Sequence, residues 1–210
     1  MSVFAKVFAM IIVVHMIMLI IQYTIAGTVS KQNPFMLIKK MMPAYFTALG
    51  TQSSASTIPV TLAHTKQLGV KKRVANFSVP LLATIHLSGS TITLVSCAIA
   101  VMLLQGQTAT FASMMPFILM LGITMIAAPG VPGGAVMATL GLLELILGFT
   151  ETMISLMITL LYLAQDSFGT ACNVTGDGAI TVIANKFATE EKQTSTEDTL
   201  ETDWLMTSSR

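Results

Sequence analysis

The chain has 210 residues, of which 53% are hydrophobic and only 10% are charged, whereas roughly a quarter of the residues in a soluble domain carry charge. This composition predicts a protein that lies in a lipid bilayer. The net charge is +1, and no basic patch contains interleaved aromatic residues, which argues against nucleic-acid binding. Cys97 and Cys172 lie in apolar stretches without metal-ligand spacing, which excludes a zinc site or a disulfide framework from the expected features.

Residues 1–27 contain the first predicted transmembrane helix. Within its apolar stretch, 7–26, the polar residues are His15, Gln22 and Thr24, and about twenty apolar residues in a helix cross a bilayer. A cleaved signal peptide is the weaker interpretation, because the run is long and further membrane segments follow. His15 is explained equally well as a functional group and as a hydrogen-bonded histidine within a packed helix.

Residues 28–70 predict a re-entrant hairpin. A half-length helix at 34–49 leads to a polar tip at 50–57, and a second arm at 58–68 returns toward the same side. Each arm has roughly fifteen residues or fewer, which is too short to cross a bilayer. Two half-helices that meet at a serine-rich turn are typical of a hairpin that enters and leaves the membrane on one face.

Residues 106–150 predict a second hairpin of the same kind. Its apolar arms, 111–128 and 136–148, flank a tip at 129–134 that is rich in proline and glycine. Proline lacks a backbone N–H and glycine permits positive φ, so this tip interrupts the helix.

Residues 71–105, between the hairpins, predict a transmembrane helix that is interrupted at 86–90 by the sequence His-Leu-Ser-Gly-Ser. Non-helical backbone at bilayer depth is tolerated where it faces protein, water or a ligand. The order hairpin, helix, hairpin, helix resembles an inverted repeat. The predicted fold class is therefore an all-α membrane protein with transmembrane helices and two re-entrant helical hairpins.

The last predicted span, 151–188, carries Asp166, Asn173 and Asp177, whose spacings of seven and four place them on one helical face. Carboxylates inside a membrane segment are functional candidates by default, and the stretch 152–184 contains no Lys or Arg to pair with them. A substrate ammonium or a metal ion would supply the missing positive charge. Half-helix N-termini at the hairpin tips attract a carboxylate. An amino acid carries one carboxylate and one ammonium, so it suits a site made from the hairpin tips and the carboxylates of the last span.

Charge distribution predicts the orientation of these segments. Lysine and arginine concentrate between the first span and the interrupted helix, whereas the region 105–151 contains only two glutamates. The positive-inside rule then places the first hairpin at the cytoplasmic side and the second at the outside. Residues 189–210, rich in acidic and hydroxyl side chains, predict a cytoplasmic tail.

Four motifs resemble the signatures of the dicarboxylate/amino acid:cation symporter family, also called the glutamate transporter family. They are QSSASTIP at 52–59, PLLATIHLSGS at 80–90, GVPG at 130–133 and DSFGTACNVTGD at 166–177. Their order and separations match the family from about residue 3 to residue 187. The resemblance implies an elevator-type transport domain formed by the sixth helix, hairpin one, helix seven, hairpin two and helix eight of that family.

The resemblance also implies two sets of site residues. Ser54 and Asn173 match positions that bind the substrate carboxylate, and Asp166 matches the acceptor of its amino group. The implied substrate-binding residues are Ser53, Ser54, Ser90, Val131, Pro132, Gly133, Asp166, Thr170 and Asn173. The implied sodium-binding residues, which contribute side chains or backbone carbonyls, are Leu82, Thr84, His86, Asn173 and Asp177.

Departures from the family pattern bear on substrate and coupling ion. Members with acidic substrates carry an arginine where this sequence has Gly169, and the variable position of the first tip is Gln52. Without a guanidinium to clamp a second carboxylate, a small neutral amino acid is favoured over a dicarboxylate. The family's Asn-Met-Asp-Gly-Thr becomes His-Leu-Ser-Gly-Ser from His86 onward, so both Na+ and H+ stay open as coupling ions.

The favoured hypothesis is a multi-pass symporter of the plasma membrane, homotrimeric in its complete form. The alternative is a truncated or split subunit, inactive alone, because the resemblance begins at the sixth helix and leaves out the N-terminal scaffold half. An enzyme is not expected, since no nucleophile, base and orienting group occur together at plausible spacing.

Overall fold

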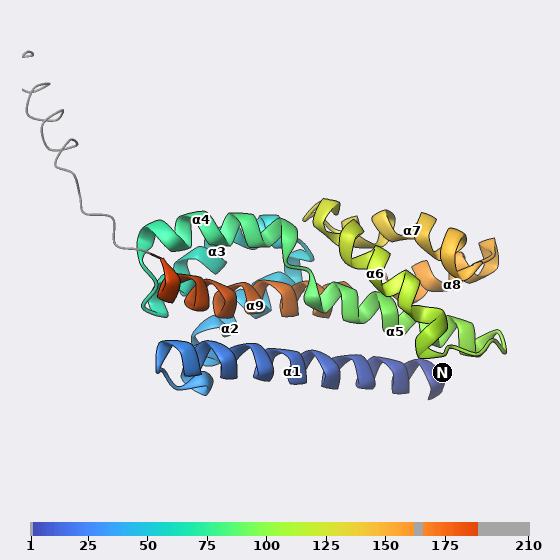
Figure 1. Ribbon diagram of the computed structural model, residues 1–210, viewed down its shortest axis with the longest axis horizontal. Helices are drawn as coiled ribbons and strands as arrows, with labels where there is room; N and C mark the ends of the chain where they lie inside the picture. The colour runs from blue at the N-terminus through green and yellow to red at the C-terminus, as the bar shows by residue number, and fades with distance from the viewer. Residues whose placement is uncertain (1, 162–165, 189–210) are drawn as a thin grey trace, which may run out of the picture.

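The computed structural model describes residues 2–161 and 166–188, and every element in these ranges is helical. In Figure 1, the long helix α1 runs along one side, and α9 lies between it and the α4–α5 pair. Helices α2 and α3 occupy one end of the elongated molecule, and α6, α7 and α8 occupy the other. The helices are α1 Ser2–Ser30, α2 Pro34–Thr51, α3 Ser54–Gln67, α4 Lys72–Ile85, α5 Ser88–Leu104, α6 Phe111–Ala127, α7 Gly134–Leu147, α8 Glu151–Leu160 and α9 Asp166–Phe187.

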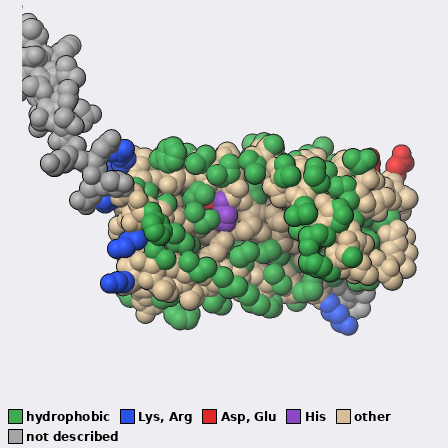
Figure 2. Space-filling model, viewed as in Figure 1, with side chains coloured by type: hydrophobic (Ala, Val, Ile, Leu, Met, Phe, Trp, Pro, Cys, Tyr) green, Lys and Arg blue, Asp and Glu red, His purple; other side chains and the backbone are tan. Residues whose placement is uncertain are grey.

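Two stretches are long and apolar enough to cross a membrane, by length and composition. One is Ala5–Ser30 in α1, and the other is Lys72–Leu104, which comprises α4, the break and α5. The first stretch is mostly exposed, and Val13, Ile17, Ile20, Ile21 and Ile25 are each at least 50% exposed on its outer face. Figure 2 shows hydrophobic side chains spread over this side of the molecule between two charged ends.

Local capping residues explain where the helices of the first hairpin begin and end. Asn33 caps α2 by accepting a hydrogen bond from the Phe35 amide, and Pro34 occupies the first turn, where its missing N–H is harmless. Helix α2 ends at Gln52, which has a left-handed φ of 53°. Ser53 then caps α3 by accepting a bond from the Ser56 amide. The polar tip is therefore shorter than the expected stretch 50–57, because its second half forms the first turn of α3.

The structure describes α8 and α9 within the last span expected at 151–188. Residues 162–165 between them lie outside the described part. The expected tail at 189–210 also lies outside it. Helix α9 packs against α1, α2, α3, α4 and α5, so it forms the centre of the described fold.

Two apolar cores hold the helices together. The first joins α5, α6, α7 and α8 around Phe117, Leu121 and Leu143, all of which are fully buried. The second joins α1, α2 and α9 around Tyr23 and Met41. Buried polar residues lie at the first hairpin tip and after the break between α4 and α5, among them Ser53, Ser54 and Ser90.

Candidate functional site

The tips of the two hairpins contact each other near the middle of the molecule's long axis (Figure 1). The carbonyl of Gly130, in the α6–α7 tip, accepts hydrogen bonds from the Ser53 hydroxyl at 2.8 Å and from the Ala55 amide at 3.1 Å. A Cβ at Gly130 would lie 2.9 Å from the Ala83 carbonyl oxygen, so glycine lets the second tip approach α4 closely. The first tip is also tied to α9, because the Gln52 amide donates to the Ser167 hydroxyl at 2.8 Å.

The interrupted helix breaks at His86 and Leu87, and Asn173 of α9 holds the start of α5. The Asn173 side-chain oxygen accepts from the amides of Gly89 at 2.7 Å and Ser90 at 3.3 Å. Its side-chain nitrogen donates to the Ser90 hydroxyl at 2.8 Å. Leu87 supplies no side-chain cap for α5, so Asn173 does so from a neighbouring helix.

A pocket lies between the tips, the helix break and α9. Neutral hydroxyl and amide groups make up its polar lining, and these residues are mostly buried. The lining residues are Gln52, Ser54, Leu87, Ser90, Pro129, Gly130, Val131, Ala135, Thr170 and Asn173.

Five of the substrate-binding residues implied by the sequence come together in this pocket: Ser54, Ser90, Val131, Thr170 and Asn173. Ser53 instead caps α3 and bonds to the opposite tip. Pro132 and Gly133 belong to the second tip without lining the pocket, and Gly133 takes the left-handed φ of 73° that precedes α7. Asp166 begins α9, but its side chain lies outside the described residues.

The sequence interpretation did not assign Leu87, Pro129, Gly130 and Ala135 to the substrate set. All four lie within two residues of positions assigned from the motifs, but the spacing of the motifs does not tell which neighbours face the pocket. Gln52 was singled out only as a variable position.

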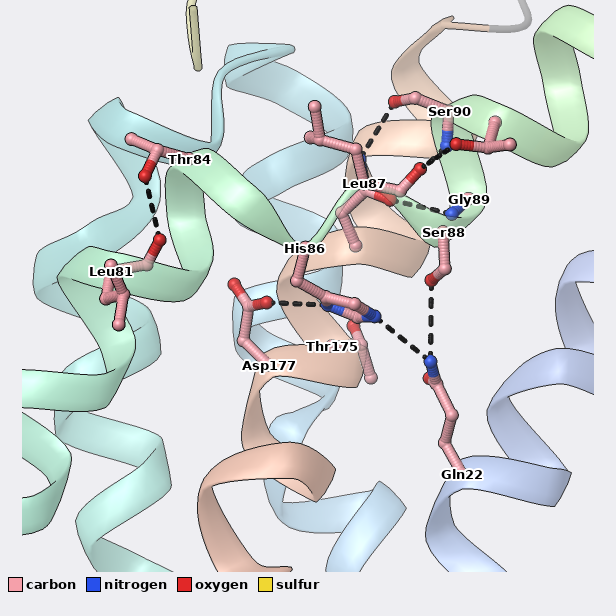
Figure 3. A network of polar contacts seen from close by, with 12 residues as sticks. Gln22, Leu81, Thr84, His86, Leu87, Ser88, Gly89, Ser90, Thr175 and Asp177 are labelled. Atoms are coloured by element: carbon pink, nitrogen blue, oxygen red, sulfur yellow. Dashed lines mark hydrogen bonds and ion pairs between the residues drawn. The ribbon is translucent and has the colours of Figure 1, made fainter. Parts of the chain in front are cut away.

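A second polar group joins the break to α1 and α9. Figure 3 shows the His86 ring between Asp177 and Gln22. His86 Nδ1 lies 2.8 Å from Asp177 Oδ1, and His86 Nε2 lies 3.1 Å from the Gln22 amide nitrogen, which is also 3.4 Å from the Ser88 hydroxyl. Because the Gln22 amide nitrogen can only donate, this pattern places the His86 hydrogen on Nδ1, where it donates to the carboxylate.

This arrangement bears on whether the implied sodium-binding residues suit a sodium ion. Sodium takes oxygen ligands, yet Asp177 Oδ1 already accepts from an imidazole N–H and is 1% exposed. The Leu82 carbonyl accepts the His86 backbone N–H at 2.9 Å. Thr84 is exposed, and its hydroxyl donates to the Leu81 carbonyl. As arranged here, the His86 imidazole takes the place that a cation would have beside Asp177 Oδ1.

Among the described residues, no group of three or more His, Cys, Asp or Glu side chains is arranged to hold a metal. The described polar groups of the site are therefore hydroxyls, amides and one histidine–carboxylate pair.

Comparison with known proteins gives this geometry a context. A sequence model of the sodium:dicarboxylate symporter family matches residues 1–187. The chain is 31% identical over 149 residues to an excitatory amino acid transporter of Caenorhabditis elegans, which covers 70% of this chain and 29% of that protein. It is 32% identical over 120 residues to the serine/threonine transporter SstT of Acinetobacter baumannii, covering 57% and 30%.

A similar match involves the neutral amino acid transporter B(0) of Mus musculus, with 26% identity over 172 residues that cover 81% of this chain and 31% of that protein. The chain thus spans about 30% of the length of these curated relatives.

Proposed function

Since the chain belongs to the sodium:dicarboxylate symporter family, we propose that it forms the substrate-binding and translocating part of a secondary symporter for a small neutral amino acid. The observation that carries this proposal is the pocket between the hairpin tips, with its lining of neutral hydroxyl and amide groups. Ser54 and Asn173 are suited to bind the substrate carboxylate. Asp166, whose side chain lies outside the described residues, is proposed to receive the ammonium.

The preference for a neutral substrate is supported by the packing at Gly169. A Cβ at this position would lie 3.1 Å from the Thr93 hydroxyl and 3.2 Å from the Ser90 backbone nitrogen. Any side chain there, arginine included, would require Thr93 and Ser90 of α5 to shift by a few tenths of an ångström. No Lys or Arg occurs among the lining residues, so nothing in the described lining would neutralise a second carboxylate.

We further propose that α2–α3 and α6–α7 are re-entrant hairpins of an elevator-type domain. Their tips meet inside the molecule, which supports entry from opposite faces of the bilayer. Figure 2 shows lysine and arginine gathered at the end that holds α2 and α3, and acidic side chains together with further basic atoms at the opposite end. The positive-inside rule would place the basic end, and the chain's C-terminal tail, in the cytoplasm of a plasma-membrane protein.

The coupling ion is proposed to be a cation whose site does not use Asp177 as arranged here. His86, Gln22 and Ser88 form a protein-made environment for that carboxylate. The residues of this chain then have two roles. The tips and Asn173 bind and orient the amino acid, and His86 donates a hydrogen bond to the buried carboxylate of Asp177 on α9.

A second candidate function follows from the length of the match. Because the curated relatives are more than three times as long as the matched portions, the chain can bind an amino acid and still need a scaffold half, ultimately in a homotrimer, for translocation.

Binding and uptake by the full 210-residue chain separate these two functions. The chain in lipid nanodiscs would be titrated with L-serine, L-threonine, L-alanine, L-aspartate and L-glutamate, in sodium and in choline buffers, with Asn173→Ala as the control that removes the pocket amide. Proteoliposomes would then be assayed for uptake of the same amino acids.

Binding of the neutral amino acids with uptake supports the symporter, and binding without uptake supports the dependent subunit. Aspartate binding without any binding of serine, threonine or alanine would refute the neutral preference.

A further inference from the structure

His15 is a buried polar residue on a helix whose outer face is apolar. Its side chain is 1% exposed, and it points from α1 toward the first turn of α5. His15 Nε2 lies 2.9 Å from the Gly89 carbonyl oxygen and 3.2 Å from the Thr93 hydroxyl. Since a carbonyl oxygen can only accept, Nε2 carries the hydrogen and donates it to Gly89.

Gly89 is also held from the opposite side by the pocket residue Asn173. The Gly89 amide donates to the Asn173 side chain, which in turn donates to the Ser90 hydroxyl. His15 of α1 therefore hydrogen-bonds the carbonyl of Gly89, and Asn173 of α9 hydrogen-bonds its amide. Ser90 and Asn173 both line the pocket, whereas His15 does not.

The turn held in this way has almost no free space around it. A Cβ at Gly89 would lie 2.4 Å from the Gly169 carbonyl oxygen and 2.6 Å from the Cys172 Cβ. The Cys172 thiol also lies 3.9 Å from the His15 carbonyl oxygen, so α1, α5 and α9 meet at one point. In such close packing, a shift of the Gly89 carbonyl moves the Ser90 hydroxyl with it.

We infer that His15 is a positioning residue of the amino-acid pocket. It fixes the first turn of α5, and thereby holds the side chains of Ser90 and Asn173 in the positions from which they contact the ligand. This inference rests on the proposed function, because it assumes that the pocket binds an amino acid. It gives α1 a role in ligand affinity although the described side chains of α1 do not line the pocket.

The test compares two amides at position 15 in the full chain in nanodiscs. Glutamine can place its amide nitrogen near the position of histidine Nε2, whereas asparagine is too short. We expect His15→Gln to stay within about twofold of the wild-type Kd for L-serine, and His15→Asn to raise that Kd about fivefold to tenfold, as loss of one buried hydrogen bond does.

Tyr23→Phe is the matched control. It removes a buried hydrogen bond from α1 to α9, between the Tyr23 hydroxyl and the Thr175 carbonyl at 2.6 Å, without touching the turn at Gly89. We expect it to lower the melting temperature and to leave the Kd for L-serine unchanged. Equal affinities of His15→Gln and His15→Asn would overturn the inference.

Hydrogen exchange supplies a readout that needs no ligand. The amides of Gly89 and Ser90 should exchange faster in His15→Asn than in His15→Gln, because the turn they belong to is no longer fixed. If the wild-type chain binds no amino acid, the proposed function fails. In that case unequal exchange still supports the positioning role of His15 at the turn, and equal exchange overturns it.

Discussion

Replacing His86 by alanine removes the hydrogen-bond donor from a carboxylate that is 1% exposed. The lost contact is the 2.8 Å bond from His86 Nδ1 to Asp177 Oδ1. Removing the donor of a buried hydrogen bond to a charged group destabilises a protein by about 3 kcal/mol, because the carboxylate is left without a partner. For a domain of this size, a loss of about 3 kcal/mol lowers the melting temperature by roughly 6–12 °C.

Asp177→Asn should be milder, with a loss of about 1–2 kcal/mol, because the neutral amide oxygen still accepts from His86. The double variant should then be more stable than the sum of the two single losses predicts, by about 1–3 kcal/mol, since it leaves no unpaired buried charge. A double variant that is more stable than this sum is expected only if His86 and Asp177 interact directly.

The assay uses the protein's own cysteines. Cys97 and Cys172 are both buried at 0% exposure, and the sequence contains only 2 cysteines, so a thiol-reactive dye reports unfolding as the protein is heated. His64→Ala is the control, because His64 Nδ1 has no hydrogen-bond partner among the described residues. Losses that simply add in the double variant would refute the argument that His86 satisfies the buried carboxylate of Asp177.

Three further predictions concern the turn, the tips and the coupling ion. Gly89→Ala should lower the melting temperature and weaken L-serine binding, since its Cβ would lie 2.4 Å from the Gly169 carbonyl oxygen. Gly141→Ala is the control, and it should be neutral or stabilising because nothing lies within 4 Å of its Cβ. Ser53→Ala removes both the cap of α3 and the bond to Gly130, so we expect a loss of about 1 kcal/mol in thermal unfolding together with weaker L-serine binding. His86→Asn tests proton coupling through the pH dependence of uptake, because histidine is the residue type that titrates near neutral pH; unchanged pH dependence with intact uptake would exclude a proton carried by His86.

The helical composition and the position of the helix break could be predicted from the sequence, because both follow from local chemistry. The interruption expected at 86–90 lies at His86 and Leu87, where hydroxyl residues and glycine follow directly. The pocket residues Ser54 and Asn173 could be named from the motifs that carry the family resemblance.

The partners of His86 could not be predicted in this way. His86 and Asp177 are 91 residues apart, and Gln22 is 64 residues from His86, so their contact depends on how three helices pack. Helical spacing placed Asn173 and Asp177 on one face of α9, but it did not show that Asn173 caps α5 while Asp177 meets a histidine. The spacing of His15 and Gln22, seven residues apart on α1, was a signal that polar groups share one face of an apolar helix.

The packing of α9 predicts an uneven tolerance of the chain to random mutation. Cβ atoms added at Gly169, Gly176 and Gly178 would lie 3.1 Å or less from side chains of α1, α2, α5 and the helix break, among them Gln22, Met41, Thr93 and His86. Large side chains at these glycines should therefore be depleted in a saturation screen for folded protein. The outward positions of α1, such as Ile17 and Ile21, should accept any apolar residue, so the two helices would leave opposite patterns of variability in the sequences that survive selection.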